Sequence, residues 1–165
     1  MYSVTHAADV LAPPAAVWRL VADLEADWNP LFARSQLVGA ARRGVGAERQ
    51  SWLAGEDGRF DERVIDWAEG SWLTTEVTST TLPLASAKLT LGVEPCGAGR
   101  STAIVVVEYE PQREALSRFG GVFRLRARLC KDTQRMIEGL KRAAEGATRP
   151  DVSSGVAGRV LGAAR

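Results

Sequence analysis

The sequence contains few of the residues that most often carry metal, nucleophilic or disulfide chemistry. Its 165 residues include one histidine, His6, and two cysteines, Cys96 and Cys130. No acid or cysteine lies at a useful spacing from His6, which argues against a catalytic triad or a histidine-rich metal site, so we expect His6 at the surface. The cysteines lack metal-ligand spacing and are expected to be free thiols, as in a reducing compartment. No metal and no other cofactor is expected.

A strong excess of charge and a long apolar run are also missing. The formal net charge is +1, so the total charge does not indicate nucleic acid or an anionic membrane as an obligatory partner. No apolar stretch approaches the ~20 residues of a membrane helix, and residues 1–11 do not have the pattern of a signal peptide. We therefore expect a cytoplasmic protein without integral membrane association; the oligomeric state stays open.

One long amphipathic segment, residues 114–145, organises the rest of the chain. Residues at helical spacing form a stripe along one face of this segment. The residues in the middle of the stripe are polar or weakly apolar, which fits either a cavity beneath the helix or a core helix with a snorkelling arginine. Charged residues between the stripe positions form an arginine-rich outer face. The stripe follows helical spacing through Leu116, Phe119, Phe123, Arg126, Cys130, Thr133, Ile137, Leu140 and Ala144.

The segment before this helix predicts an antiparallel sheet. β-branched and aromatic residues recur between short glycine-bearing turns, which is typical of a meander. Pro14 begins a short helix after the first strand, and the break at residues 27–30 precedes a second short helical turn. Trp67 and Trp72 flank the Gly70 turn and are expected to pack as a cross-strand pair. The seven expected strands are residues 3–11, 34–39, 47–53, 59–67, 72–79, 84–94 and 102–110.

These elements predict one α+β domain, residues 1–145, in which a curved seven-stranded antiparallel sheet wraps around the long C-terminal helix. With 45% hydrophobic residues, the chain can bury a substantial core. Two short helices are expected after the first strand. Residues 146–165, rich in glycine, alanine and serine, are expected to form a flexible tail.

Several local patterns resemble the START, polyketide cyclase and birch-pollen-allergen superfamily of helix-grip proteins, often called SRPBCC. The resemblance is strongest to the bacterial polyketide cyclase/dehydrase and lipid-transport branch, and it implies a cavity for a hydrophobic small molecule. It covers about residues 3–145. It is carried by Ala-Pro-Pro-Ala-Ala-Val-Trp at residues 12–18, Asp-Trp-Asn-Pro at 27–30, Gly-Val-Gly-Ala-Glu-Arg at 44–49, Glu-Arg-Val at 62–64, Leu-Pro-Leu at 82–84 and Gly-Leu-Lys at 139–141.

The resemblance also implies where a ligand's polar end would lie. Arg49 and Glu62 match two cavity positions of the related plant abscisic-acid receptors, although the receptors' gate sequence is absent at residues 52–55 and Arg34 is only the nearest candidate for their cavity lysine. Arg49 and Glu62 are either an inward cross-strand pair or an exposed salt bridge, depending on strand parity. The expected ligand-binding residues are Arg49, Ser51, Leu53, Phe60, Glu62, Val64, Leu84, Leu89, Val105, Val107, Arg126, Cys130 and Thr133.

Three functions remain open from the sequence. The first is a non-catalytic carrier or sensor of a polyketide, lipid or isoprenoid-like molecule. The second, supported by the resemblance alone, is a polyketide cyclase or dehydratase in which Glu62 acts as general base and Arg49 or Arg126 stabilises an enolate, with Tyr109 as a further candidate. The third is a protein-interaction module that uses the arginine-rich helix face.

Overall fold

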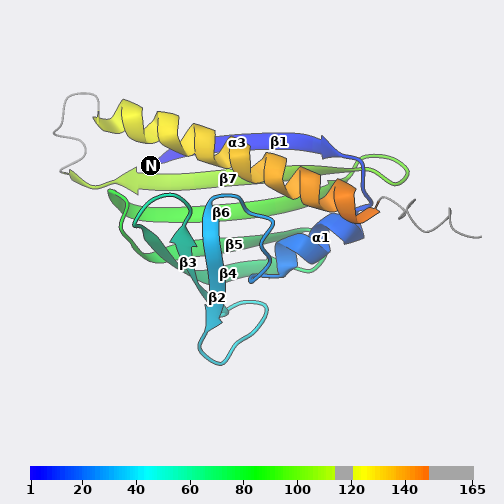
Figure 1. The fold of residues 1–165 in the computed structure, drawn as a ribbon, viewed down its shortest axis with the longest axis horizontal. Helices are drawn as coiled ribbons and strands as arrows, with labels where there is room; N and C mark the ends of the chain where they lie inside the picture. The colour runs from blue at the N-terminus through cyan, green and yellow to red at the C-terminus, as the bar shows by residue number, and fades with distance from the viewer. Residues whose placement is uncertain (114–120, 149–165) are drawn as a thin grey trace, which may run out of the picture.

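The computed structural model describes residues 1–113 and 121–148, which form an α+β fold of one sheet and two helices (Figure 1). Helix α1 follows the first strand, and helix α3 ends the described chain. The elements are β1 (Tyr2–Val10), α1 (Pro14–Ala22), β2 (Phe32–Val38), β3 (Glu48–Leu53), β4 (Arg59–Ala68), β5 (Trp72–Thr80), β6 (Leu84–Pro95), β7 (Ser101–Pro111) and α3 (Gly121–Thr148).

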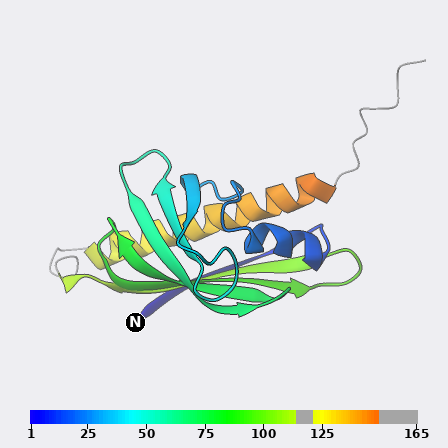
Figure 2. The same cartoon turned by 90° about the horizontal axis from the view of Figure 1, so that it is seen from below.

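The seven strands form a single antiparallel sheet in the order β1-β7-β6-β5-β4-β3-β2. Each strand from β2 to β7 pairs with its neighbour in sequence, because the turns between them are short. β1 pairs with β7 and forms one edge of the sheet. The sheet is strongly curved, and both helices lie on its concave side (Figure 2). The predicted fold class is confirmed.

Helix α3 crosses the sheet because one stripe of its residues is apolar and buried. Its C-terminal half buries Met136, Ile137, Leu140 and Ala144 against β1, β7 and α1. A glycine, Gly139, allows the close approach of the segment after α1. A Cβ atom at Gly139 would lie 2.5 Å from Cδ of Pro30 and 2.7 Å from the Trp28 carbonyl oxygen.

The apolar core has two parts. The larger cluster lies under α1 and the C-terminal half of α3, and includes Val17, Val105 and Leu140. The smaller cluster lies under the first turns of α3, and includes Tyr109 and Leu125. A curved sheet that contacts a straight helix at two places leaves space between them, and this space positions the candidate site.

Some boundaries differ from the sequence predictions. Of the expected helix at residues 114–145, residues 114–120 lie outside the described residues and the rest belongs to α3. Residues 146–148 of the expected tail continue α3, and residues 149–165 lie outside the described part. The second short helix predicted after the break at residues 27–30 is a series of turns, since Asn29 Oδ1 accepts the Leu31 N–H at 3.0 Å and stops helical bonding.

The expected pairing of Trp67 with Trp72 is wrong. The ring of Trp67 packs edge-on against Trp18 of α1, with centroids 5.3 Å apart. Trp72 is 45% exposed, and its Nε1 donates to Asp66 at 3.0 Å. The register explains the difference, because Trp67 lies opposite Leu73 and Trp72 lies opposite Ala68. Neighbouring positions of a strand project from opposite faces of the sheet.

Candidate functional site

An apolar cavity of ≈ 70 Å³ lies between α3 and the concave face of the sheet. It occupies the junction of the two core clusters: Leu89 and Met136 come from the larger one, and Leu84 and Leu129 from the smaller one. Pockets that enclose drug-sized ligands typically have ~300–1,000 Å³. In this state the cavity therefore holds only a small group, and a larger molecule requires its walls to separate.

Glu62 on β4 is the buried carboxylate of the cavity wall, and it accepts three hydrogen bonds from neighbouring donors. Arg49 donates to Glu62 Oε2 from Nη2 at 2.6 Å and from Nε at 3.1 Å, and the Thr75 hydroxyl donates to Oε1 at 2.9 Å. Arg49 and Glu62 are 8% and 4% exposed. Two buried charges are tolerated when they are paired and further hydrogen-bonded, as here. Of the two alternatives, an inward pair or an exposed salt bridge, the structure has the inward pair.

Arg49 stands behind the cavity wall rather than in it. Its guanidinium lies 5.5 Å from the centre of the Phe32 ring, and Phe32 lines the cavity. Nη1 of Arg49 donates to the Leu24 carbonyl at 3.4 Å, which links the pair to the end of the α1 region. The arginine thus fixes the Glu62 carboxylate, while Glu62 alone of the two presents atoms to the cavity.

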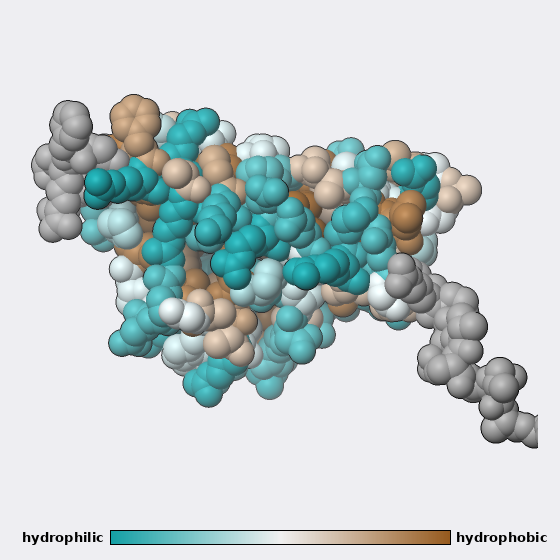
Figure 3. Space-filling view, turned by 45° about the horizontal axis from the view of Figure 1, so that its top comes forward, coloured by the Kyte–Doolittle hydropathy of each residue, from teal (hydrophilic) through white to brown (hydrophobic). Residues whose placement is uncertain are grey.

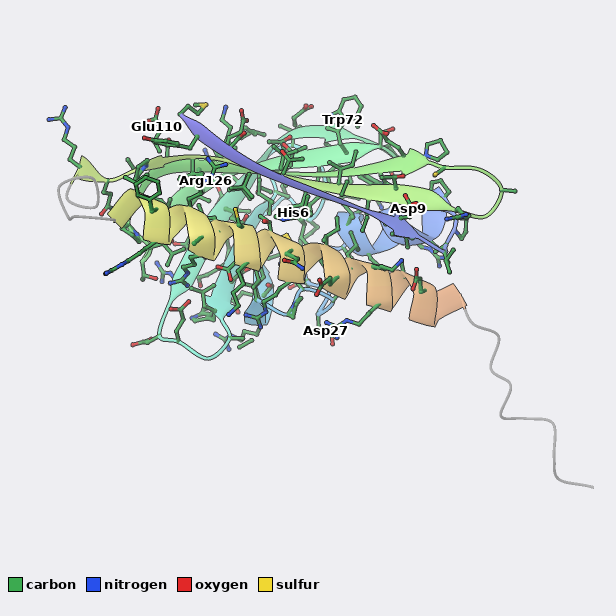
Figure 4. All side chains as sticks on the ribbon, turned by 90° about the horizontal axis from the view of Figure 1, so that it is seen from above. His6, Asp9, Asp27, Trp72, Glu110 and Arg126 are labelled. Carbon is green, nitrogen blue, oxygen red and sulfur yellow. The ribbon has the colours of Figure 1, made fainter. Side chains whose placement is uncertain are left out.

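Thr133 on α3 forms the polar part of the opposite wall. Its hydroxyl lies 2.8 Å from Nδ1 of His6, 2.8 Å from the Leu129 carbonyl and 3.0 Å from the Cys130 carbonyl. His6 is half-buried where β1 runs beside α3 (Figure 4). The prediction of His6 as a surface residue is therefore wrong, because inward positions of β1 pack against the helix.

Several lining residues of the cavity are partly exposed where α3 lies near the β3–β4 turn. Arg128 and Asp132 of α3 line it on one side, and Leu31 and Leu53 on the other. Arg128 Nη2 pairs with Glu56 of the turn, so one ion pair joins the two sides. Arg128 is 37% exposed, and surface ion pairs contribute only about 0–1 kcal/mol. This side of the cavity is therefore held by a weak contact.

The structure brings together about half of the residues expected at the site. Others are buried elsewhere: Arg49 behind Phe32, Ser51 in a 2.8 Å hydrogen bond with Ser35, and Val64 and Val105 in the larger core cluster. Those that line the cavity are Leu53, Phe60, Glu62, Leu84, Leu89, Val107 and Thr133.

The expected helix stripe is wrong at Phe123, Arg126 and Cys130, and its first members, Leu116 and Phe119, lie outside the described residues. Phe123 is 80% exposed, and Arg126 is also exposed, on the side of α3 near the end of β7 where Glu110 lies (Figure 4). Cys130 is half-buried and packs against the smaller core cluster rather than lining the cavity. The buried stripe instead runs through Leu125, Leu129 and Thr133.

Sequence reasoning missed several lining residues. A signal for one helical residue was present, since Leu129 is more apolar than Cys130, the stripe residue beside it; Met136 lies beside the equally apolar Ile137 and had no such signal. Leu31 and Phe32 follow the break at residues 27–30, where no periodicity indicates which side chain faces inward. Further lining residues are Val77, Leu82, Ala87, Lys88, Arg128 and Asp132.

The outer face of α3 is hydrophilic. Figure 3 shows hydrophilic side chains gathered over the helix, as expected from its charged residues. Within residues 1–113 and 121–148, no group of three or more histidine, cysteine or acidic residues is arranged to hold a metal ion. None of the helices in this described part is long and apolar enough to cross a membrane.

Comparisons with known proteins agree with this architecture. The sequence profile of one protein family, described as "Polyketide cyclase / dehydrase and lipid transport", matches residues 1–145. No curated protein matches the chain.

Three solved structures have the same fold. The Zhui aromatase/cyclase from Streptomyces sp. R1128 is 16% identical with a TM-score of 0.78, covering 94% of this chain and 99% of its own. The di-domain ARO/CYC BexL is 22% identical with a TM-score of 0.74, covering 91% of this chain and 48% of its own. A START superfamily protein from Mycobacterium smegmatis is 19% identical with a TM-score of 0.66, covering 89% of this chain and 97% of its own.

Proposed function

The chain belongs to the polyketide cyclase / dehydrase and lipid transport family, and on this premise we propose that it binds a hydrophobic small molecule between α3 and the sheet, as a carrier or sensor. The molecule is of polyketide, lipid or isoprenoid type. The observation that carries the proposal is the apolar cavity at the junction of the two core clusters, with Glu62 in its wall. A buried apolar space with few polar groups is the usual form of a small-molecule site.

The Glu62 carboxylate suits the recognition of a ligand's polar end. Arg49 and Thr75 hold both of its oxygens in place, so its position does not depend on the ligand. A ligand hydroxyl that enters the cavity meets a pre-oriented acceptor, while the leucine side chains around it contact the apolar body. The mouth between Arg128 and Glu56 admits the ligand when this exposed ion pair breaks.

A fluorescent probe, N-phenyl-1-naphthylamine, tests the proposed binding. Ala87 lines the cavity, and Ala87→Leu fills part of its small volume, so we expect probe affinity to fall at least tenfold. Ala7→Leu, on the exposed face of β1, is the matched control and should bind as the original chain does. Equal affinity in both variants would place the probe outside this cavity. Native mass spectrometry of protein purified from its own host is a separate test for a retained ligand.

A second candidate, cyclase or dehydratase chemistry, is favoured by one observation: a carboxylate faces the cavity. Three hydrogen bonds from Arg49 and Thr75 already occupy both oxygens of Glu62, so few lone pairs remain to accept a proton from a substrate. This arrangement favours binding over proton abstraction. Turnover of a poly-β-ketone surrogate that disappears in Glu62→Gln, with the probe affinity retained, would support catalysis instead.

A further inference from the structure

The hydroxyl of Tyr109 is buried without a hydrogen-bond partner. Tyr109 is 1% exposed, and of all buried side-chain polar atoms in the described residues, its hydroxyl is the one that lacks a partner. Burial raises the pKa of Tyr109, with Cys130 and Tyr2 acting in the same direction and Arg126 in the opposite one. The hydroxyl is therefore neutral and free to donate. Buried polar groups are nearly always satisfied, so an unsatisfied one needs an explanation.

Tyr109 and Glu62 lie on the same concave face of the sheet, on either side of the cavity. Tyr109 on β7 lies opposite Ala87 on β6, and Val77 on β5 lies opposite Glu62 on β4. The pairing of β5 with β6 ends at Glu76 and Lys88, so Val77 and Ala87 follow directly where the two strands begin to separate. Three strand steps separate β4 from β7, about 14 Å along a regular sheet.

The two residues between Tyr109 and Glu62 lie in the floor of the cavity. Ala87 and Val77 both line it, as does Glu62 at one end. Tyr109 does not line it in this state, but packs in the smaller core cluster with Leu84, Ala87 and Leu129. Leu84 and Leu129 are themselves lining residues, so a ligand that displaces them reaches the phenol.

We propose that the Tyr109 hydroxyl is the second polar anchor of the ligand site, which then takes an elongated apolar molecule with an oxygen at each end. This inference rests on the proposed function and narrows its ligand class. One ligand oxygen faces Glu62, and the other accepts the Tyr109 hydrogen bond. A body of about three fused rings, or a chain of that length, lies over Ala87 and Val77 once the cavity walls separate. A fatty acid, with one polar end, leaves Tyr109 unsatisfied.

Two fluorescent probes of the same shape test this. 2,6-Dihydroxyanthracene carries a hydroxyl at each end, and 2-methylanthracene carries none. We expect Tyr109→Phe to weaken binding of the dihydroxy probe about tenfold, the effect of one hydrogen bond, and to leave binding of the methyl probe unchanged. Tyr2→Phe is the matched control, since Tyr2 stacks on Tyr109 with ring centroids 5.6 Å apart but is 40% exposed.

Thermal unfolding of the free protein provides an independent readout. Tyr109→Phe removes an unsatisfied group and keeps the ring, so its Tm should be unchanged or higher; a lower Tm would mean that the hydroxyl has a structural partner and would overturn the inference. Equal loss of both probes, or loss of neither, would also overturn it while cavity binding stands. If the original chain binds neither probe, the proposed function fails and the inference fails with it.

Discussion

Arg49 Nη2 lies 2.6 Å from Glu62 Oε2 in a pair that is buried on both sides, yet Glu62 alone of the two lines the cavity. The two residues therefore have different roles. Arg49 neutralises and orients the carboxylate, and Glu62 presents it to the ligand space. Three of the four hydrogen bonds that the two side chains make join neighbouring strands, so the sheet itself fixes their geometry.

Loss of Arg49 should destabilise the fold strongly. Arg49→Met leaves a buried carboxylate without its charged partner, and we expect the free energy of unfolding to fall by about 3–5 kcal/mol in urea denaturation. Arg63→Met is the control, because Arg63 pairs with Glu48 at 2.8 Å on the exposed face of the same two strands. That variant should lose less than about 1 kcal/mol. Similar losses in both would show that water reaches the Arg49 pair.

Loss of Glu56 should speed ligand entrance. Glu56→Gln removes the ion pair with Arg128 that joins the β3–β4 turn to α3, so stopped-flow association of N-phenyl-1-naphthylamine should accelerate by up to about fivefold. Asp57→Asn, in the same turn, is the control and should leave the rate unchanged. High salt should accelerate binding to the original chain and not to Glu56→Gln. An association rate that is the same in Glu56→Gln and at high salt would mean that the ligand enters elsewhere.

Gly139 and Gly146 of α3 have different surroundings and should respond oppositely to alanine. At Gly139 a Cβ atom would lie 2.7 Å from the backbone oxygen of Trp28, so Gly139→Ala should lower stability by about 1–3 kcal/mol despite the better helix propensity. At Gly146 nothing lies within 4 Å, and Gly146→Ala should raise stability by up to about 1 kcal/mol. Thermal denaturation of both variants measures this. Stabilisation by both would mean that the Trp28–Pro30 segment moves away from α3.

Acid should release a contact that holds α1 to the sheet. Trp18 Nε1 donates to Glu69 Oε1 at 2.8 Å and Trp67 Nε1 donates to Oε2 at 2.9 Å; these bonds, aided by Arg43, hold the pKa of Glu69 below its usual 4.5. The lower pKa in the folded state means that the stabilisation is present above pH 4.5 and disappears as the pH falls through the folded-state value.

The measurement is Tm as a function of pH. The original chain should lose more Tm than Glu69→Gln as the pH falls below 4.5, since the amide has no charge to titrate. Glu94→Gln, at an exposed position of β6, should retain the original pH dependence. Parallel curves for the original chain and Glu69→Gln would contradict the assignment.

The sequence alone determined the order of the elements and the fold class. Alternating apolar residues between glycine turns produce an antiparallel meander, and a helix with one apolar stripe must cover its concave face. The same alternation, with the resemblance at Arg49 and Glu62, predicted a cross-strand pair. These are local properties, because they depend on residues close together in the chain or on adjacent strands.

Tertiary structure alone decided which side chains meet the cavity. A rotation of α3 by one residue turns Arg126 outward and Leu129 inward, and that rotation is set by how the helix packs on the whole sheet. The contact of His6 with Thr133 joins residues 127 positions apart. Tyr109 and Glu62 share the concave face because four strands pair side by side, and no single segment of sequence contains that information.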